Sequence, residues 1–484
     1  MAKKSTEKKT SLEPSEVFCA VGLLMPSDDM KKLVKDETGA ALLKWASSDG
    51  DIKLNGNGKI SGCDKIAKKG IDPLDGRFKA MFKKAGTLKR GDDKRKDMVA
   101  NIVAGFSGAL GSKAFMAAMN TKVDVATAVY MTGAKWPSDV DIFRMKDQSS
   151  GFDYNSSDLV VQAGPKKFFG ISLKKKPNIK SPDPTIINKA FSTFLDGDDK
   201  NKDALEKLNK VRQKYFANIV KKAQKDGIIN VRGLESMSTE QVWNTKLRKP
   251  DGDLVALINL KGVNEKDDPI ELTDVPGTVD QLTIYDKPKG RMGLKDYINA
   301  DLSKRNNELF KEFDEIIQDN AEYFANSLID MVLKVQLNTK LKAKDIGDYN
   351  FEFALVTGFA DYKQNTKDAT KDKLKLEKAK FIPLHTILCG LANLAGAKEP
   401  YKMDPDTKQK EKTNAAKVFY TLSRQGIPIL DLQLRYKGDY KSMPQFFATI
   451  TDEFYTQLDE KCLVTKSDKK PNETYILNKT LYTK

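Results

Sequence analysis

Asp158, Ser172 and Lys174 are the residues whose types and spacing are best suited to chemistry. Asp158 precedes a short apolar run at 159–161, and a Gly-Pro pair at 164–165 punctuates the chain as a turn does. Ser172 and Lys174 lie in the β-forming run that follows, on the face opposite its apolar residues. Antiparallel pairing of the two runs would bring Asp158 close to Lys174. A carboxylate beside an ammonium group can hold a hard cation and steady a phosphate.

An Asp, a turn and then a carboxylate-x-Lys on the next strand is the motif of the restriction-endonuclease-like nucleases, the PD-(D/E)XK superfamily. Residues 154–194 resemble that motif, with Asp158 followed by Ser172 and Lys174. The resemblance implies that Asp158 binds Mg²⁺ or Mn²⁺. It implies that Lys174 orients the attacking water or stabilises charge on the phosphate. It also implies that a helix over 183–194 takes the place of the family's helix.

Ser172 departs from the family pattern, because a serine hydroxyl is a poor Mg²⁺ ligand. Another carboxylate completes the site, or a water bridges to Ser172, or the site is degenerate. Glu16, in a helix expected from Glu16 to Met25 and capped by Ser15, is one candidate ligand. Asp141, which alternates with apolar residues after Asp139, is another. The alternative is a basic surface hairpin with a salt bridge, and an ordinary first-turn acid at Glu16.

Basic residues on and after the hairpin are candidate contacts to a nucleic-acid backbone. Six lysines and no acid lie between 166 and 180, and the whole chain has a formal net charge of +16. Such a balance favours polyanions, although a lysine-rich proteome gives the same bias without any ligand. The candidate contacts are Lys166, Lys167, Lys175, Lys176, Lys189, Arg435 and Lys437.

A second ordered polar face is expected near the end of the chain. In the alternating run 427–435, Asp431, Gln433 and Arg435 share one face. That face can grip a phosphate backbone while nearby aromatic residues stack on bases. The alternative is an amphipathic strand whose polar face is hydrated. The aromatic candidates are Tyr436, Tyr440, Phe446 and Phe447.

Cysteine, histidine and hydropathy limit the other classes of function. The four cysteines are scattered without a CxxC pair, which argues against structural zinc and disulfides and fits a reducing compartment. The single histidine, His385, excludes multi-histidine metal sites. No apolar run is long enough to span a bilayer and no signal peptide is visible, so we expect no membrane partner. The lysine-rich texture resembles large bacteriophage proteins, which places the protein in the host cytoplasm or the virion.

These patterns predict an α/β (α+β) protein. A mixed sheet with the αβββαβ core of the resembled family carries the hairpin, and a helical and α/β part follows. Helices are expected over 28–46, 99–119 and 201–226, and over 294–337 as one long helix or a helix pair. The glycines of 99–119 are expected to serve close helix packing, and the alternating run 349–362 predicts a strand. The expected domains are a basic tail (1–10), a nuclease-like domain (11–227), a small β-rich bridge (228–290) and a C-terminal domain (291–484).

The function expected from the resemblance is a Mg²⁺-dependent (or Mn²⁺-dependent) DNA nuclease that hydrolyses phosphodiester bonds. The alternative is a non-catalytic nucleic-acid-binding or phage structural protein on a degenerate nuclease fold. The sequence leaves the strandedness of the substrate and the oligomeric state open.

Overall fold

The structure is a computed structural model, and the residues that it describes form separate segments of the chain. They are residues 13–35, 39–46, 53–54, 58–59, 93–131, 142–143, 145–147, 152–154, 157–178, 187–195, 199–231, 233–248, 254–259, 271–273, 282–283, 293–331, 348–365, 372–376, 380–383, 399–407, 416–436 and 443–454.

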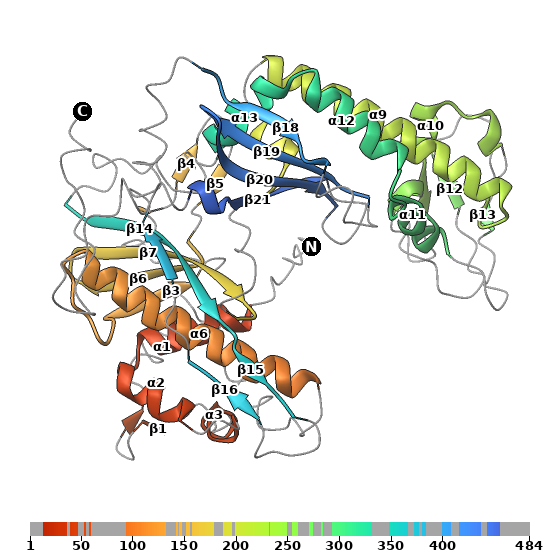
Figure 1. Cartoon of the computed structure of the whole chain (residues 1–484). Helices are drawn as coiled ribbons and strands as arrows, with labels where there is room; N and C mark the ends of the chain where they lie inside the picture. Colours follow the sequence, from red (N-terminus) through yellow and green to blue (C-terminus); the bar gives the residue numbers. More distant parts are fainter. Residues whose placement is uncertain are drawn as a thin grey trace, which may run out of the picture. The chain divides into compact units, whose positions relative to one another are not determined.

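The chain is mixed α/β and forms two compact units that are interleaved in the sequence (Figure 1). Unit 1 consists of Met1–Ile186, Met331–Ala397 and Asp452–Lys484. Unit 2 consists of Ile187–Asp330 and Lys398–Thr451. The sequence suggested consecutive domains instead, and their boundaries at 227 and 290 do not coincide with these units.

Unit 1 is built on a five-stranded mixed sheet with the strand order β17-β14-β7-β6-β3. Neighbouring strands are antiparallel except β7 and β14, which run parallel over their whole length. The predicted hairpin is confirmed as β6 and β7, and β14 is the alternating strand expected near residue 350. The strands are β3 (Ala128–Met131), β6 (Leu159–Gly164), β7 (Lys167–Lys176), β14 (Asn350–Phe359) and β17 (Lys380–Pro383).

Helices α1 (Pro14–Leu23) and α6 (Asp93–Ala118) cover one face of this sheet, as Figure 1 shows. Every second residue of the strands points to this face, and residues such as Leu159, Val161 and Ile171 pack with the helices in one apolar core. The opposite face has a smaller core of its own, in which Tyr130, Val160, Phe143 and Phe168 pack together. Both faces of the sheet are therefore covered, and the face that carries Ser172 is not open to solvent along its length.

The crossing of α1 and α6 depends on Gly105. A Cβ atom at Gly105 would lie 2.6 Å from the Cβ of Phe18 and 2.7 Å from the backbone of Cys19 and of Ser15. These distances are below normal carbon contacts, so the two helices meet through their backbones. The glycines of 99–119 were predicted to serve close helix packing, and this contact confirms it for Gly105.

We expect Gly105→Ala to lower the free energy of unfolding by about 1–3 kcal/mol, because the added methyl group forces α1 away from α6. Chemical denaturation at equilibrium measures the change. The matched control is Gly164→Ala, where the new Cβ would meet no atom within 4 Å. That control should change stability by less than about 0.5 kcal/mol. Equal stability of the Gly105 variant and the control would contradict the close crossing.

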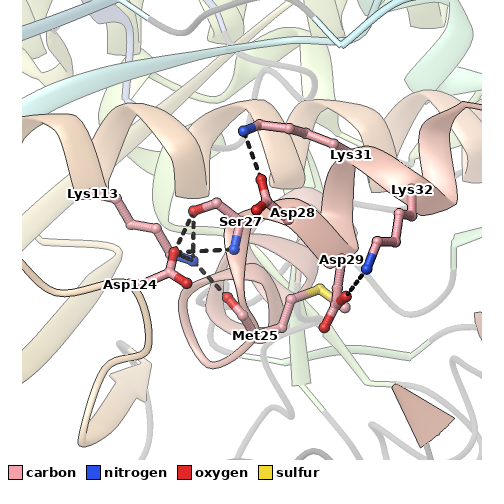
Figure 2. Close-up of polar contacts among 8 residues, drawn as sticks. All are labelled: Met25, Ser27, Asp28, Asp29, Lys31, Lys32, Lys113 and Asp124. Atoms are coloured by element: carbon pink, nitrogen blue, oxygen red, sulfur yellow. Dashed lines mark hydrogen bonds and ion pairs between the residues drawn. The ribbon is translucent and has the colours of Figure 1, made fainter. Parts of the chain in front are cut away.

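The far end of α1 is anchored by the buried side chain of Lys113, as Figure 2 shows. Lys113 Nζ donates to the Met25 carbonyl and lies 3.6 Å from an Asp124 carboxylate oxygen. Asp124 in turn accepts the Ser27 amide at 3.0 Å, at the start of α2 (Ser27–Val34). Burial lowers the pKa of the Lys113 ammonium to about 8. These contacts fix α1, and hence Glu16 in its first turn, relative to the sheet.

Unit 2 contains a second five-stranded sheet, entirely antiparallel, with the order β18-β19-β20-β21-β8. One face is apolar and packs on helices: Phe191 contacts Phe313 edge-on, and the Tyr420 hydroxyl donates to Asp314 at 2.9 Å. The strands are β18 (Lys402–Pro405), β19 (Val418–Arg424), β20 (Ile427–Arg435), β21 (Gln445–Ile450) and β8 (Ile187–Ala190).

The remaining elements are short, apart from the unit 2 helices α9, α11, α12 and α13. In unit 1 they are α3 (Ala40–Ala46), β1 (Lys53–Leu54), β2 (Gly58–Lys59), β4 (Met145–Asp147), β5 (Phe152–Tyr154), β15 (Tyr362–Lys363) and β16 (Lys373–Leu374). In unit 2 they are α8 (Phe191–Phe194), α9 (Asp199–Lys225), β9 (Asn230–Val231), α10 (Thr239–Asn244), β10 (Lys246–Arg248), β11 (Leu254–Ala256), β12 (Glu271–Thr273), β13 (Leu282–Thr283), α11 (Leu294–Leu302), α12 (Glu308–Gln318) and α13 (Ala321–Met331), with 3₁₀ turns at Leu234–Ser236 and Leu257–Asn259.

Three local predictions were wrong. The expected helix at 183–194 is instead strand β8 followed by a single helical turn, and both belong to unit 2. Ser15 does not cap α1, because the helix begins at Pro14, whose missing amide suits the first helical position. The helix expected over 28–46 divides into α2 and α3, and Gly39 between them has a positive φ of 70°.

Among the described residues, no helix is long and apolar enough to cross a membrane.

Candidate active site in unit 1

Asp158 is held at the mouth of the β6–β7 hairpin by three backbone and side-chain contacts. Its amide donates to the Ile171 carbonyl at 2.8 Å, which extends the strand pairing by one residue. Its carboxylate oxygen Oδ2 accepts the Leu173 amide at 2.6 Å and the Ser172 hydroxyl at 3.2 Å. The carboxylate is therefore fixed over the strand that carries Lys174.

Ser172 is fully buried, on the face of β7 that the smaller core covers. Its hydroxyl points at Asp158 and is used there as a donor. Where the resembled family has a metal-binding acid, this chain thus has a hydroxyl group that orients the Asp158 carboxylate.

Lys174 lies two residues further along β7 and is half-buried. The parallel neighbour β14 places Thr357 directly beside it. That neighbour was not predictable from local sequence patterns, because the two strands are far apart in the chain.

Glu16 joins this group from the first turn of α1. Burial, the Asp158 carboxylate and Glu13 raise the pKa of Glu16 from 4.5 to about 8, while the Lys174 ammonium lowers it. Glu16, Asp158 and Lys174 therefore interact electrostatically, although they come from a helix, a strand start and a second strand. These three residues were named together from the sequence, and their grouping as one site stays a prediction.

A carboxyl group whose pKa is raised by a neighbouring carboxylate is a natural place for a divalent cation, which would replace the proton on Glu16. Mg²⁺ is often held by only one or two carboxylates together with waters and substrate phosphate oxygens, so Glu16 and Asp158 fit it. Among the described residues there is no group of three or more His, Cys, Asp or Glu side chains that would hold a metal by themselves. Asp141 and Asp139, the other expected ligands, lie outside the described residues.

The lysines expected to contact nucleic acid differ in exposure. Lys166 and Lys167 are exposed at the turn of the hairpin, where Lys166 pairs with Asp348 at 3.0 Å. Lys175 is exposed and its Nζ donates to the Asn101 side chain. Lys176 is only 3% exposed, so it is a poor candidate for a backbone contact. The turn and Lys175 thus remain as the basic surface of the hairpin.

The other candidates lie outside unit 1 or outside the described residues. Lys189 is on β8, paired with Phe446 of β21, and Arg435 is at the end of β20. Both belong to unit 2. Lys437, Tyr440 and His385 are not among the described residues.

Comparison of the chain with known proteins gives no assignment. No family model, no curated protein and no solved structure matches it.

Proposed function

We propose that unit 1 carries the active site of a metal-dependent nuclease that hydrolyses phosphodiester bonds of DNA. Two observations carry this proposal: the Glu16 carboxyl group interacts electrostatically with Asp158 and Lys174, and the Asp158 carboxylate is held on β7 by Ser172 and the Leu173 amide. Three separate elements supply these groups. Such a cluster is costly for folding, and costly arrangements of titratable groups are typical of functional sites.

The order of elements in unit 1 supports a restriction-endonuclease-like core. Helices α1, α2, α3 and α6 precede the antiparallel strands β3, β6 and β7, and β14 then adds in parallel to β7. When the additional helices and the short strands β1, β2, β4 and β5 are set aside, this order agrees with the first four elements and the last element of αβββαβ. The departure is the connection from β7 to β14: most of unit 2 stands there in the chain, where the family has its helix.

Each group has a distinct chemical task in this proposal. Glu16 and Asp158 would hold Mg²⁺ or Mn²⁺, which when bound activates water and stabilises the departing oxygen. The Lys174 ammonium offsets the charge that accumulates on the phosphate in the transition state. Ser172 and the Leu173 amide keep the Asp158 carboxylate in place.

A basic surface supports a polyanionic substrate. The chain has a formal net charge of +16, and the hairpin turn presents Lys166 and Lys167 to solvent. Binding that depends on such charges weakens steeply as the salt concentration rises.

The direct test is cleavage of supercoiled plasmid and of circular single-stranded DNA with Mg²⁺, with Mn²⁺ or with chelator. We expect metal-dependent cleavage by the wild type and a loss of about 10²–10³-fold in Lys174→Ala, because one charge on the transition state is lost. Lys122→Ala is the matched control, since it removes an exposed lysine of unit 1 away from this cluster.

Equal cleavage by Lys174→Ala and the control would overturn the assignment of the site. DNA binding without cleavage under any metal would overturn the nuclease itself. The buried Ser172 in place of an acid would then mark a degenerate site, and the protein would be a non-catalytic nucleic-acid-binding protein.

A further inference from the structure

The sheet of unit 2 has a second face that the proposed nuclease site does not use. Residues of β19, β20 and β21 that point away from the helices form rows across the strands. In one row Phe419, Gln433 and Phe447 are direct neighbours, and in the next Arg435 and Gln445 are. Lys417, just before β19, lies beside Arg435 by the same register. We call these six residues the aromatic face.

The aromatic face carries two cations side by side. The Arg435 guanidinium carbon lies 4.0 Å from the centre of the Phe447 ring. Burial and the Arg435 charge lower the pKa of Lys417, and burial lowers the pKa of Arg435. Like charges that are held together and partly out of water favour binding of an anion.

Two polar atoms of this face have no partner in the part of the chain that the structure describes. Arg435 Nε and Gln445 Oε1 are buried, and neither has a hydrogen-bond partner among the described residues. Buried polar atoms are normally paired, so an orphaned donor and acceptor on neighbouring strands point to a ligand with both kinds of group. The acids of the face, Asp431 and Asp404, lie toward the opposite end of the sheet, where Asp431 accepts the Thr421 hydroxyl.

The aromatic rings decide the class of anion. Phe419 and Phe447 flank Gln433 on the same row, and Phe419 is half-buried. Rings and guanidinium planes on a sheet stack on bases, which are available only when the strand is unpaired. An amide such as Gln433 or Gln445 can pair with base edges, which carry donors and acceptors together.

We propose that the aromatic face of unit 2 binds single-stranded nucleic acid, with Phe419 and the Arg435–Phe447 pair against bases and Lys417 and Arg435 against phosphate. This proposal rests on unit 2 alone and does not require the nuclease activity proposed for unit 1.

The structure also revises the set of stacking residues expected from the sequence. Phe446 is fully buried on the opposite side of the sheet. Tyr436 contacts the rings of Phe216 and Phe310, so it belongs to the packing of unit 2. Phe447 is 8% exposed and serves as the ring on which the Arg435 guanidinium stacks. Phe419 is added because it lies directly across from Gln433, and Tyr440 is outside the described residues.

The test is fluorescence anisotropy of the full-length chain with a labelled oligothymidylate of about 16 nucleotides, with chelator present. We expect Phe419→Ala and Arg435→Gln each to weaken binding about 10-fold. For Arg435→Gln the slope of log K against log salt should fall by about 0.7, whereas for Phe419→Ala it should not change. The affinity for a labelled duplex of the same length should fall by less than about 2-fold in Phe419→Ala.

Lys402→Gln is the matched control for the charge change. It removes one exposed cation from the edge strand β18 of the same sheet. It should change single-strand affinity by less than about 2-fold, and its thermal stability serves as a reference for the other variants. Lys417→Gln, at a half-exposed position before β19, should weaken binding as Arg435→Gln does even if Phe419→Ala disturbs the fold.

The proposal would be overturned if Phe419→Ala, Arg435→Gln and Lys417→Gln all bound the single strand as tightly as the wild type does. So would equal losses for strand and duplex in Phe419→Ala, because stacking on bases would then contribute nothing. Since these measurements use chelator and variants of unit 2, they succeed or fail independently of the cleavage test on Lys174.

Discussion

Glu16→Gln should abolish metal-dependent cleavage and at the same time make the protein more stable above neutral pH. Glutamine keeps the size of the side chain but cannot ionise. In the wild type, burial and the Asp158 carboxylate raise the pKa of Glu16 to about 8. Loss of one of the two proposed cation ligands should reduce cleavage by about 10³-fold or more, since a bound cation supplies several kcal/mol of stabilisation.

The direction of the stability change follows from proton linkage. The folded-state pKa of Glu16 lies above its ordinary value of 4.5, so between these pH values the folded protein holds a proton that the unfolded chain lacks. The unfolding free energy therefore falls as pH rises from about 4.5 to about 8. Each pKa unit corresponds to about 1.4 kcal/mol, and because the site is partly hydrated we expect a gain of about 2 kcal/mol for the glutamine variant.

The measurement is chemical denaturation of wild type and variant at about pH 6 and about pH 9, together with cleavage at both values. Wild-type cleavage should rise with pH as Glu16 loses its proton. Asp97→Asn is the control, because Asp97 is an exposed acid of unit 1 that is not among the charges that shift the pKa of Glu16. Parallel stability curves for wild type and Glu16→Gln would show that Glu16 does not titrate as a buried acid. Unchanged cleavage would remove it from the site.

The parts of this site that are local in sequence were predictable. The β6–β7 hairpin is encoded by two β-forming runs with Gly164 between them, so the approach of Asp158 to Lys174 follows from short-range rules. Glu16 was reached only through the family resemblance. The electrostatic interaction of Glu16 with Asp158 depends on how α1 crosses α6 at Gly105. A single sequence does not reveal which helix packs against a given glycine.

The long-range pairings were not predictable. β14 lies beside β7 although unit 2 stands between them in the chain, and β8 pairs with β21 of the distant segment 445–450. Alternation identified β14 as a strand without identifying its neighbour. β8 has only four residues, so its pattern was too short to compete with the helix expected at 183–194.

The burial of Ser172 was also not predictable, because it too depends on residues that are distant in the sequence. Alternation correctly placed Ser172 and Lys174 on the face opposite Ile171 and Leu173. It did not reveal that a second core, which includes Phe143 and Phe351, covers that face. The Ser172 hydroxyl consequently donates to Asp158. Of these two residues, the proposed mechanism assigns the cation to Asp158.

Two substitutions of Asp158 should therefore separate its charge from its hydrogen bonds. Asparagine retains a carbonyl oxygen that can accept the Leu173 amide, whereas alanine leaves that amide and the Ser172 hydroxyl without this partner. We expect Asp158→Asn and Asp158→Ala to lose cleavage by about 10³-fold or more alike. Only the alanine variant should lose stability, by about 1–3 kcal/mol.

Cleavage of plasmid DNA with Mg²⁺ and binding of the same DNA with chelator are the two measurements. Binding should persist in both variants, because removal of a negative charge does not oppose a polyanion. Asp348→Asn is the matched control: it neutralises an exposed aspartate near the hairpin turn and should cleave as the wild type does. An asparagine variant that binds and cleaves normally would rule out a metal at Asp158. A variant that binds without cleaving, while the wild type cleaves, would show that the charge at Asp158 serves the reaction and that its hydrogen bonds serve the fold.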